Sequence, residues 1–415
     1  MNDLESQDNS LTDYRSLKMQ AQKEKDERNY VEAIKLYKEL FEKYPDEIDT
    51  WDKVYYSWSL YYNNIKPAKD VTIAEDVELI TELTSQSDNS AEDSACVYTL
   101  SVFKMLKVLK NSKIPTKWKD ILYWSGKLNS DYLSNNTFKY TDYEGNKRET
   151  PSRKEEFYLL TTRALYESGE YYEAIRLSQE ALEKIKEFRF NNDLWIKRTI
   201  ALSFYAVGTY KTTIKYLKEV LKTKTDWYIK KELAEAYYKT GEINDALALA
   251  VDSALQYGTI DYKYQLYDFI AEMLRDKGLD SEAKLHNKLS YQIRVKNNWD
   301  IDDEELENLK SLDIDTTEVL DPIPLEQSLR VLWEDLKYES QEQLHGTITK
   351  ILANGKSGFV TKKFSSENYY FNFYSYKGDP IEIRDGLPVS FYLEEGYNKK
   401  KKEKNWVAVN IKEEE

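Results

Sequence analysis

The chain has 415 residues, of which 32% are charged and 41% hydrophobic, and this balance excludes an intrinsically disordered chain. The net charge is −14, but residues 345–415 hold 12 Lys/Arg against 10 Asp/Glu, so the rest of the chain carries −16. An acidic body repels phosphate backbones, and we therefore expect any nucleic-acid site to lie in the C-terminal part.

The N-terminal segment and the single cysteine bear on cellular location. Residues 1–13 are acidic and polar, so we expect a flexible segment without a secretory signal. The most apolar stretch, 95–109, is interrupted by Lys104 and Lys107 and is too short and too charged to span a membrane. Cys96 stands alone, which excludes an internal disulfide and a cysteine-based zinc site and fits a reducing compartment. We expect a cytoplasmic protein without membrane contact.

Residues 14–297 contain a repeated layout of two helices. Four segments each show apolar residues at helical spacing, then a glycine, then a second helical pattern. A small residue or threonine stands seven positions before and five positions after each glycine. The glycines are Gly169, Gly208, Gly241 and Gly278, the preceding residues are Thr162, Ala201, Ala234 and Ala271, and the following ones are Ala174, Thr213, Ala246 and Ala283. Glycine can end the first helix in a left-handed conformation, and small residues let the two helices approach closely.

These residues resemble the tetratricopeptide repeat. The resemblance extends toward the N-terminus, where Arg28 replaces the turn glycine and five further residues stand at the family's signature offsets. They are Leu17, Ala21, Ala33, Tyr37 and Pro45. The resemblance implies a right-handed superhelix whose concave face binds a protein or peptide. The alternative is that the array is only a spacer or an oligomerisation surface.

The pattern is irregular between the first repeat and the four clear ones. Residues 94–133 are expected to form a helix pair around Ile114 and Pro115, and Asn135–Pro151 is expected to be a loop. The sequence therefore predicts four clear repeats, one degenerate repeat and further irregular helix pairs.

Residues 298–344 are expected to link the repeats to the C-terminal part. Asp300 is the expected N-cap of a helix that starts with four acidic residues, and because these fan around the helix axis we expect no metal site there. Pro322 and Pro324 precede a second helix whose apolar residues share one face: Leu325, Leu329, Leu332, Trp333 and Leu336. We expect this helix to cap the last repeat, and the alternative is a docking helix for a partner.

From residue 345 the pattern changes from helical to alternating, and five short strands are predicted up to residue 411, followed by an acidic tail at 412–415. This stretch resembles a cold-shock domain, a five-stranded oligonucleotide-binding (OB-fold) β-barrel. The residues at matching positions are Gly346, Gly358, Phe359, Val360, Tyr370, Asn372, Phe373, Gly386, Val389, Phe391, Ala408 and Asn410. The predicted fold class is mainly α, a tetratricopeptide-like helical solenoid followed by this small barrel.

The cold-shock resemblance implies a surface for single-stranded nucleic acid, RNA ahead of DNA. The candidate residues combine aromatic rings for base stacking with lysines for phosphates and one amide: Lys350, Lys356, Phe359, Lys362, Tyr370, Asn372, Phe373, Lys399, Lys400 and Lys401. On strict alternation Phe373 shares a face with Tyr369 and Phe371, which would be core. Lys350 and Ser357 replace two aromatic residues of the family motif. The alternative is a barrel retained for protein contact.

No catalytic constellation is visible in the sequence. His286 and His345, the two histidines, belong to different modules, and no phosphate-binding loop or nucleophile motif accompanies them. We therefore predict a non-enzymatic adaptor without cofactor or metal, which holds a protein on the repeats and single-stranded nucleic acid on the barrel. A pure protein-interaction scaffold whose barrel no longer binds nucleic acid is the alternative. A third possibility is an enzyme subunit whose catalytic centre lies on a partner chain.

Overall fold

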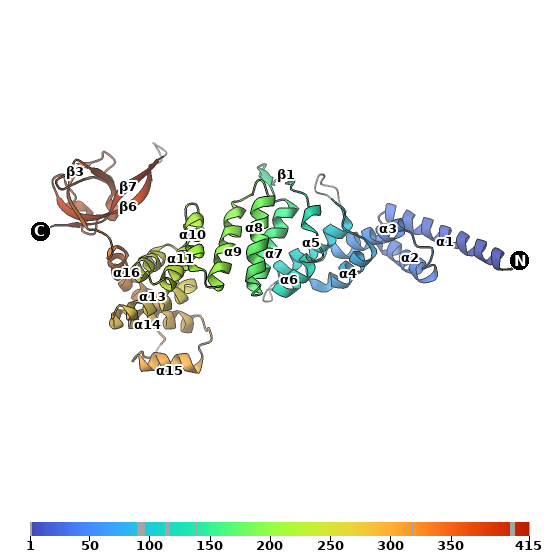
Figure 1. Cartoon of the computed structure of the whole chain (residues 1–415), viewed down its shortest axis with the longest axis horizontal. Helices are drawn as coiled ribbons and strands as arrows, with labels where there is room; N and C mark the ends of the chain where they lie inside the picture. Colours follow the sequence, from blue (N-terminus) through green and yellow to red (C-terminus); the bar gives the residue numbers. More distant parts are fainter. Residues whose placement is uncertain are drawn as a thin grey trace. The chain divides into compact units, whose positions relative to one another are not determined.

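The structure is a computed structural model that describes residues 2–88, 96–112, 117–137, 139–317, 319–398 and 403–414. The chain divides into two compact units, which we call unit 1 (residues 1–216) and unit 2 (residues 217–415). Figure 1 shows the helices and strands of both units, coloured along the sequence.

Unit 1 is built almost entirely of helices. They are α1 (Asn2–Asp26), α2 (Tyr30–Lys43), α3 (Thr50–Leu60), the π-helix η1 (Tyr61–Ile65), the 3-10 helix η2 (Val71–Ile73), α4 (Ala74–Leu83), α5 (Val97–Lys110), α6 (Trp118–Ser125), the 3-10 helix η3 (Ser130–Tyr132), α7 (Arg153–Glu167), α8 (Tyr171–Lys184), α9 (Asn192–Ala206) and α10 (Tyr210–Leu221), whose last residues belong to unit 2. The helix α1 begins at Asn2, inside the segment 1–13 that we expected to be flexible. The expected helix pair at 94–133 is α5 and α6, and its predicted turn at Ile114 and Pro115 lies outside the described residues.

The segment Asn135–Pro151 is not the plain loop that we expected. Its central residues form a β-hairpin of strands β1 (Lys139–Thr141) and β2 (Lys147–Glu149). The turn is set locally, because the Asp142 carboxylate accepts hydrogen bonds from the backbone N–H groups of Glu144 (3.0 Å) and Asn146 (2.8 Å). Gly145 supplies a positive φ of 83°.

All four predicted turn glycines end their helices in the left-handed conformation. The φ angles of Gly169, Gly208, Gly241 and Gly278 lie between 75° and 85°. The residue after each glycine donates its backbone N–H to the carbonyl five residues earlier, as in Glu170 to Leu165 at 2.9 Å. All eight of the small residues and threonines that we predicted at the helix crossings are fully buried: Thr162, Ala174, Ala201, Thr213, Ala234, Ala246, Ala271 and Ala283. The paired-helix repeat is therefore confirmed at the level of its turns and crossings.

The degenerate first repeat makes the same turn without glycine. Arg28 has a φ of 63°, and Asn29 donates its backbone N–H to the carbonyl of Glu24 at 2.8 Å. Its crossing residues Ala21 and Ala33 are fully buried like those of the clear repeats. The fold of the repeat therefore holds this arginine in a backbone region that side chains with a Cβ adopt at a cost of roughly 1–2 kcal/mol.

Replacing Arg28 with glycine is expected to stabilise unit 1. The relief of the left-handed conformation outweighs the entropy that glycine adds to the unfolded chain, and a net gain of about 0.5–1 kcal/mol is expected. Urea unfolding followed by circular dichroism measures the gain. Gly169→Ala is the matched control and should lower stability by a similar amount, since its φ is 85°. A loss of stability in the glycine variant would show that the Arg28 side chain is itself required.

The helices of unit 2 that follow α10 continue the paired arrangement. They are α11 (Trp227–Lys239), α12 (Ile243–Leu255), the 3-10 helix η4 (Ile260–Lys263), α13 (Tyr264–Asp276), α14 (Asp280–Lys296), α15 (Asp303–Ser311) and α16 (Pro322–Tyr338). The N-cap of α15 is Asp302, whose carboxylate accepts from the backbone N–H of Glu305 at 2.8 Å, and not Asp300 as the sequence suggested. Capping by Asp302 places three of the acidic residues in the first turn, where the helix dipole favours them.

The helix α16 packs into the core of the last repeats. Its Trp333 is fully buried together with residues of α11 to α14. The indole ring stacks on Tyr267 with centroids 5.5 Å apart and an interplanar angle of 5°. The indole N–H donates to Nε2 of His286 at 2.7 Å, and Nδ1 of that histidine faces the carbonyl oxygen of Glu282 at 2.7 Å. Because Nε2 accepts a hydrogen bond, it is unprotonated, so Nδ1 carries the proton and the imidazole is neutral.

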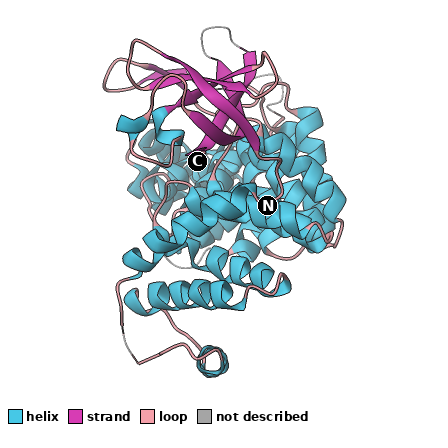
Figure 2. Cartoon of the chain, turned by 90° about the vertical axis from the view of Figure 1, so that its left-hand side faces the viewer, coloured by secondary structure: helices cyan, strands magenta, loops and turns pink. Residues whose placement is uncertain are grey.

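The five predicted strands close on themselves in a ring (magenta in Figure 2). They are β3 (Leu344–Ile351), β4 (Ser357–Lys362), β5 (Asn368–Asn372), β6 (Pro388–Asn398) and β7 (Glu403–Glu413), with the 3-10 helices η5 (Phe373–Ser375) and η6 (Pro380–Glu382) between β5 and β6. The order around the ring is β3-β4-β5-β7-β6, and every pair is antiparallel except β5 and β7. The last strand extends into the segment 412–415 that we expected to be a tail.

The interior of the ring is apolar, with Ile348, Val360, Phe371 and Phe391 among its fully buried residues. Two of the glycines that matched the cold-shock pattern lie where strands approach closely. A Cβ on Gly346 would stand 2.3 Å from the carbonyl oxygen of Thr361, and one on Gly358 would stand 2.6 Å from that of Lys350. Only glycine fits at these two positions without a backbone shift.

Candidate nucleic-acid interface

Phe359 and Tyr370 form an aromatic pair on the outer surface of the ring. They are opposite each other in the register of β4 and β5, and their ring centroids lie 5.9 Å apart at an interplanar angle of 75°. The next residues, Val360 and Phe371, are fully buried in the ring, so alternation turns the aromatic pair outward. Both rings are half-buried, and part of each remains accessible to solvent.

Lys350 joins the aromatic pair. It lies opposite Phe359 in the register of β3 and β4, after a shift of the pairing between Ile348 and Lys350. Register partners share a face of a sheet, so the exposed Lys350 side chain leaves the sheet on the same face as Phe359. The structure thus brings together one lysine and two rings from three adjacent strands.

The other candidate lysines belong to the edges of this surface. Lys356 is exposed in the turn between β3 and β4, where its backbone N–H donates to Oδ1 of Asn354 at 3.0 Å. Lys362 is half-buried at the end of β4. Lys399, Lys400 and Lys401 lie outside the described residues, in the segment that connects β6 and β7.

Asn372 and Phe373 have local roles at the end of β5. The exposed Asn372 side chain accepts the backbone N–H of Tyr374 at 3.1 Å and so caps η5. Phe373 is half-buried and stacks on the core residue Phe371, with centroids 5.8 Å apart and an interplanar angle of 20°. The structure therefore does not bring Phe373 to the aromatic pair, in agreement with the alternation of the strand.

Three exposed aromatic side chains of the ring were not among the sequence candidates. Phe364 is 98% exposed at a positive φ of 58° in the turn after β4, Tyr374 is 88% exposed in η5, and Trp406 is 58% exposed on β7. The sequence offers one signal for Phe364, which lies in the polar turn "KKFSSEN" at the end of a strand. A side chain in such a turn is not expected to be buried in the core. For Trp406 alternation gave no signal, because it shares a face with the buried Ala408.

The helix α16 contacts the ring on the side of β6. Tyr338 stacks on Tyr392 with centroids 4.8 Å apart, and its hydroxyl donates to the Glu394 carboxylate at 2.7 Å. Lys337 forms salt bridges with Glu394 (2.5 Å) and with Asp252 of α12 (2.8 Å). Two further salt bridges, Lys377 to Glu334 (2.7 Å) and Lys412 to Asp335 (3.0 Å), complete the contacts that we find among the described residues. The aromatic pair on β4 and β5 takes part in none of them.

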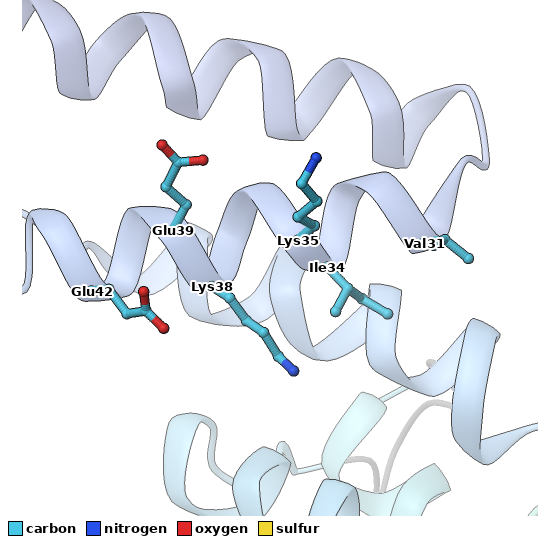
Figure 3. A pocket seen from close by; sticks show the side chains of 6 residues that line it. All are labelled: Val31, Ile34, Lys35, Lys38, Glu39 and Glu42. Carbon is cyan, nitrogen blue, oxygen red and sulfur yellow. The ribbon is translucent and has the colours of Figure 1, made fainter.

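Two surface hollows lie on the helices, and neither has the side chains of a binding site. One of about 290 Å³ in unit 2 is lined by Lys263 and Arg330, which donate to carbonyl oxygens at the end of α12: Lys263 to those of Ala254 (3.1 Å) and Gln256 (2.5 Å), Arg330 to that of Leu255 (3.1 Å). These cations satisfy the carboxyl end of a helix. The other hollow, about 440 Å³, follows α2 in unit 1. Figure 3 shows that its lysine and glutamate side chains fan out from the helix and do not converge.

Among the residues that the structure describes, no group of three or more His, Cys, Asp or Glu side chains is arranged to hold a metal ion. No helix among the same residues has the length and apolar character needed to cross a bilayer.

No protein-family model and no curated protein matches this sequence. Among solved structures, the chain is similar to a tetratricopeptide repeat protein from Parabacteroides merdae, with 12% identity over 72% of this chain and 98% of that chain and a TM-score of 0.34. It is also similar to aspartyl phosphate phosphatase F from Bacillus subtilis, with 13% identity over 79% and 84% and a TM-score of 0.39. A third is the C-terminal part of a repeat protein from Cytophaga hutchinsonii, with 14% identity over 78% and 95% and a TM-score of 0.30.

The turns and crossings described above define a tetratricopeptide-like helical-repeat fold, in which left-handed turns connect paired helices at close crossings. The same chain continues into a closed ring of five strands.

Proposed function

We propose that the ring is an oligonucleotide-binding barrel of the cold-shock type, that its outer surface binds single-stranded nucleic acid, and that RNA is preferred to DNA. The observation that carries the proposal is the aromatic pair Phe359 and Tyr370 beside Lys350, on a surface that α16 does not use. Bases stack on such rings at roughly 1–3 kcal/mol each, and lysines meet the phosphates.

The strand order supports the barrel assignment. In oligonucleotide-binding barrels the ligand lies across the second and third strands and the loops between strands one and two and strands four and five. Here β4 and β5 are the second and third strands of the ring, Lys356 belongs to the first of these loops, and Lys399, Lys400 and Lys401 belong to the second. With two rings on the surface, the affinity is expected to be modest and salt-sensitive.

The helical repeats complete the proposed adaptor by holding a protein or peptide partner. Repeats of paired helices expose extended surfaces that suit this role. The molecule thus links a protein to a strand of nucleic acid without performing chemistry of its own.

Phe359→Ala and Tyr370→Ala test the nucleic-acid proposal. Each substitution is expected to weaken binding of a fluorescently labelled single-stranded RNA by roughly 5- to 150-fold, the equivalent of about 1–3 kcal/mol of stacking. Fluorescence anisotropy at low and moderate salt measures the affinity, and labelled single-stranded DNA of the same sequence tests the preference for RNA. Thermal unfolding of each variant checks that the ring is intact.

Tyr257→Ala is the matched control, because this tyrosine is fully exposed on a loop of unit 2 and is not part of the ring. It should leave the affinity unchanged. If the parent protein binds neither strand at low salt, or if binding is indifferent to both ring substitutions, the ring serves protein contact and the chain is a scaffold.

A further inference from the structure

Unit 1 gathers five cations on one face, although the body of the protein is strongly acidic. We call this the basic face, and it consists of Lys66, Lys104, Lys107, Lys110 and Arg153. Lys66 directly follows η1, the next three lie on α5, and Arg153 begins α7. Figure 1 shows α3, α5 and α7 in succession within unit 1.

A hydrogen bond ties two of these elements together at the basic face. The Lys104 ammonium group donates to the backbone carbonyl of Lys66 at 2.9 Å, which joins α5 to the end of η1. The charge of Arg153 acts on both Tyr61 and Glu156. The charges of Lys107 and Lys110 act on Glu156 as well.

Within the described ranges the five cations have no carboxylate partner, a property that they share with Lys211 and Lys215, whereas other lysines of unit 1 form salt bridges. Lys18 forms salt bridges with Asp52 (3.0 Å) and Asp49, and Lys127 forms one with Glu78 at 2.7 Å. Across the described ranges, none of the five side chains of the basic face forms a salt bridge. One guanidinium nitrogen of Arg153 is buried without a hydrogen-bond partner there. An acidic chain that leaves its cations unneutralised on one face presents a surface for an external anion.

Glu156 on α7 is a carboxyl group on which three of these cations act. Burial by the surrounding protein raises its pKa, against the opposing effects of Lys110, Arg153 and Lys107. The side chain is nevertheless exposed to solvent.

A cluster of aromatic rings adjoins the basic face. Tyr62 stacks on Tyr30 (5.2 Å, 17°) and on Trp58 (5.5 Å, 22°), and Tyr61 meets Tyr62 edge to face at 5.5 Å. The Lys66 ammonium group lies 5.1 Å from the centroid of the Tyr62 ring. Tyr61 and Tyr62 begin the π-helix η1, a widened turn of a kind that is frequent at functional sites. Tyr62 remains 39% exposed.

We propose that the basic face and the adjoining rings form a second contact for single-stranded nucleic acid, located on unit 1 and independent of the ring. Phosphates lie against Lys66, Lys107 and Lys110, and bases lie against the exposed parts of Tyr62 and Trp58. An acidic peptide would bind the cations through its carboxylates without contacting the aromatic rings. The part of Tyr62 that stays exposed beside Lys66 favours a ligand that carries charged and planar groups side by side.

The test uses the full chain with Phe359→Ala and Tyr370→Ala, so that binding at the ring is removed. Into this background Lys107→Glu and Lys110→Glu are introduced together, since both side chains are exposed and tolerate the change. Binding of a labelled single-stranded oligouridine at low salt is expected to weaken about tenfold. The matched control is Lys211→Glu with Lys215→Glu, two exposed lysines of α10 with the same change of charge, which should have little effect. Equal effects of the two pairs would overturn the proposal.

Photo-crosslinking separates this site from the ring. An oligonucleotide that contains 4-thiouridine is expected to crosslink to residues 58–66 in the parent and in the ring variant alike. If only the ring proposal is wrong, crosslinks at β4 and β5 are absent and those of unit 1 remain. Absence of crosslinks at residues 58–66 overturns the present proposal. The same conclusion follows if a polyglutamate peptide displaces the oligonucleotide and Tyr62→Ala leaves the affinity for both ligands unchanged, because that result identifies an acidic peptide site.

Discussion

Replacing Trp333 with alanine is expected to destabilise the helical core of unit 2 by about 3–5 kcal/mol. The side chain is fully buried, stacks on Tyr267 and donates its N–H to His286. Its removal leaves a large cavity between α16 and the last repeats and a buried imidazole nitrogen without a donor. Because the same helix continues to the contacts with β6, loosening of α16 should also free the ring.

Trp333→Phe is the matched control for this prediction. Phenylalanine keeps much of the stacking surface on Tyr267 and loses the hydrogen bond to His286, so a smaller cost of about 1–3 kcal/mol is expected. Urea unfolding followed by near-ultraviolet circular dichroism measures both variants. Equal stability of the alanine variant and the parent protein would show that α16 does not contribute to the core of the repeats.

The hydrogen bond to Trp333 also explains the protonation state of His286. Desolvation lowers the pKa of this histidine to about 4, and the contact with the Glu282 carbonyl opposes the shift only in part. The imidazole therefore accepts from Trp333 across the neutral range of pH. We attribute no catalytic role to this residue, since its two ring nitrogens are occupied by structural partners.

Replacing Lys337 with methionine is expected to cost about 1–3 kcal/mol, because Glu394 loses its cation and Asp252 keeps only Lys230. Lys337 bridges Asp252 of α12 and Glu394 of β6, and the side chain of each of the three residues is at most 35% exposed. Burial opposes the charge of Lys337, but the two carboxylates more than compensate and raise its pKa. Lys230 also pairs with Asp252, so the network joins α11, α12, α16 and β6.

Lys377→Met serves as the control for the Lys337 prediction. It removes another salt bridge between the ring and α16, but both partners, Lys377 and Glu334, are about one-third exposed and a cost of roughly 0–1 kcal/mol is expected. Thermal unfolding measures stability, and limited proteolysis at residues 339–343 reports whether the ring has loosened from α16. If the two variants are equally stable, the Lys337 network does not hold the ring.

The repeats could be predicted from the sequence because their determinants are local. A glycine with a left-handed turn and a small residue at a fixed offset specify a helix pair within about 30 residues. The turn at Arg28 shows the same hydrogen bond without glycine, so packing of the two helices enforces what the local residue disfavours. The hairpin at β1 and β2 escaped prediction because its strands are three residues long, polar and exposed, and carry no alternating pattern.

Part of the ring surface could also be predicted from the sequence, because the alternation of side chains along a strand is a local property. Alternation along β4 and β5 turned Phe359 and Tyr370 outward and directed Phe373 toward Phe371, as observed. The face of Lys350 depended on a shift in the pairing of β3 with β4, which periodicity alone does not reveal.

The amino-acid sequence by itself determined the repeats, the switch to strands at residue 345 and the residues that alternate on β4 and β5, because helix turns and strand faces depend on neighbours along the chain. Only the tertiary structure decided which charges meet. Net charge averages over the whole surface and assigned nucleic-acid binding to the C-terminal part, whereas folding collects Lys66, Lys107 and Arg153 from distant segments on one face. Electrostatic potential depends on distances in space, and these follow here from the contact of α5 with the end of η1.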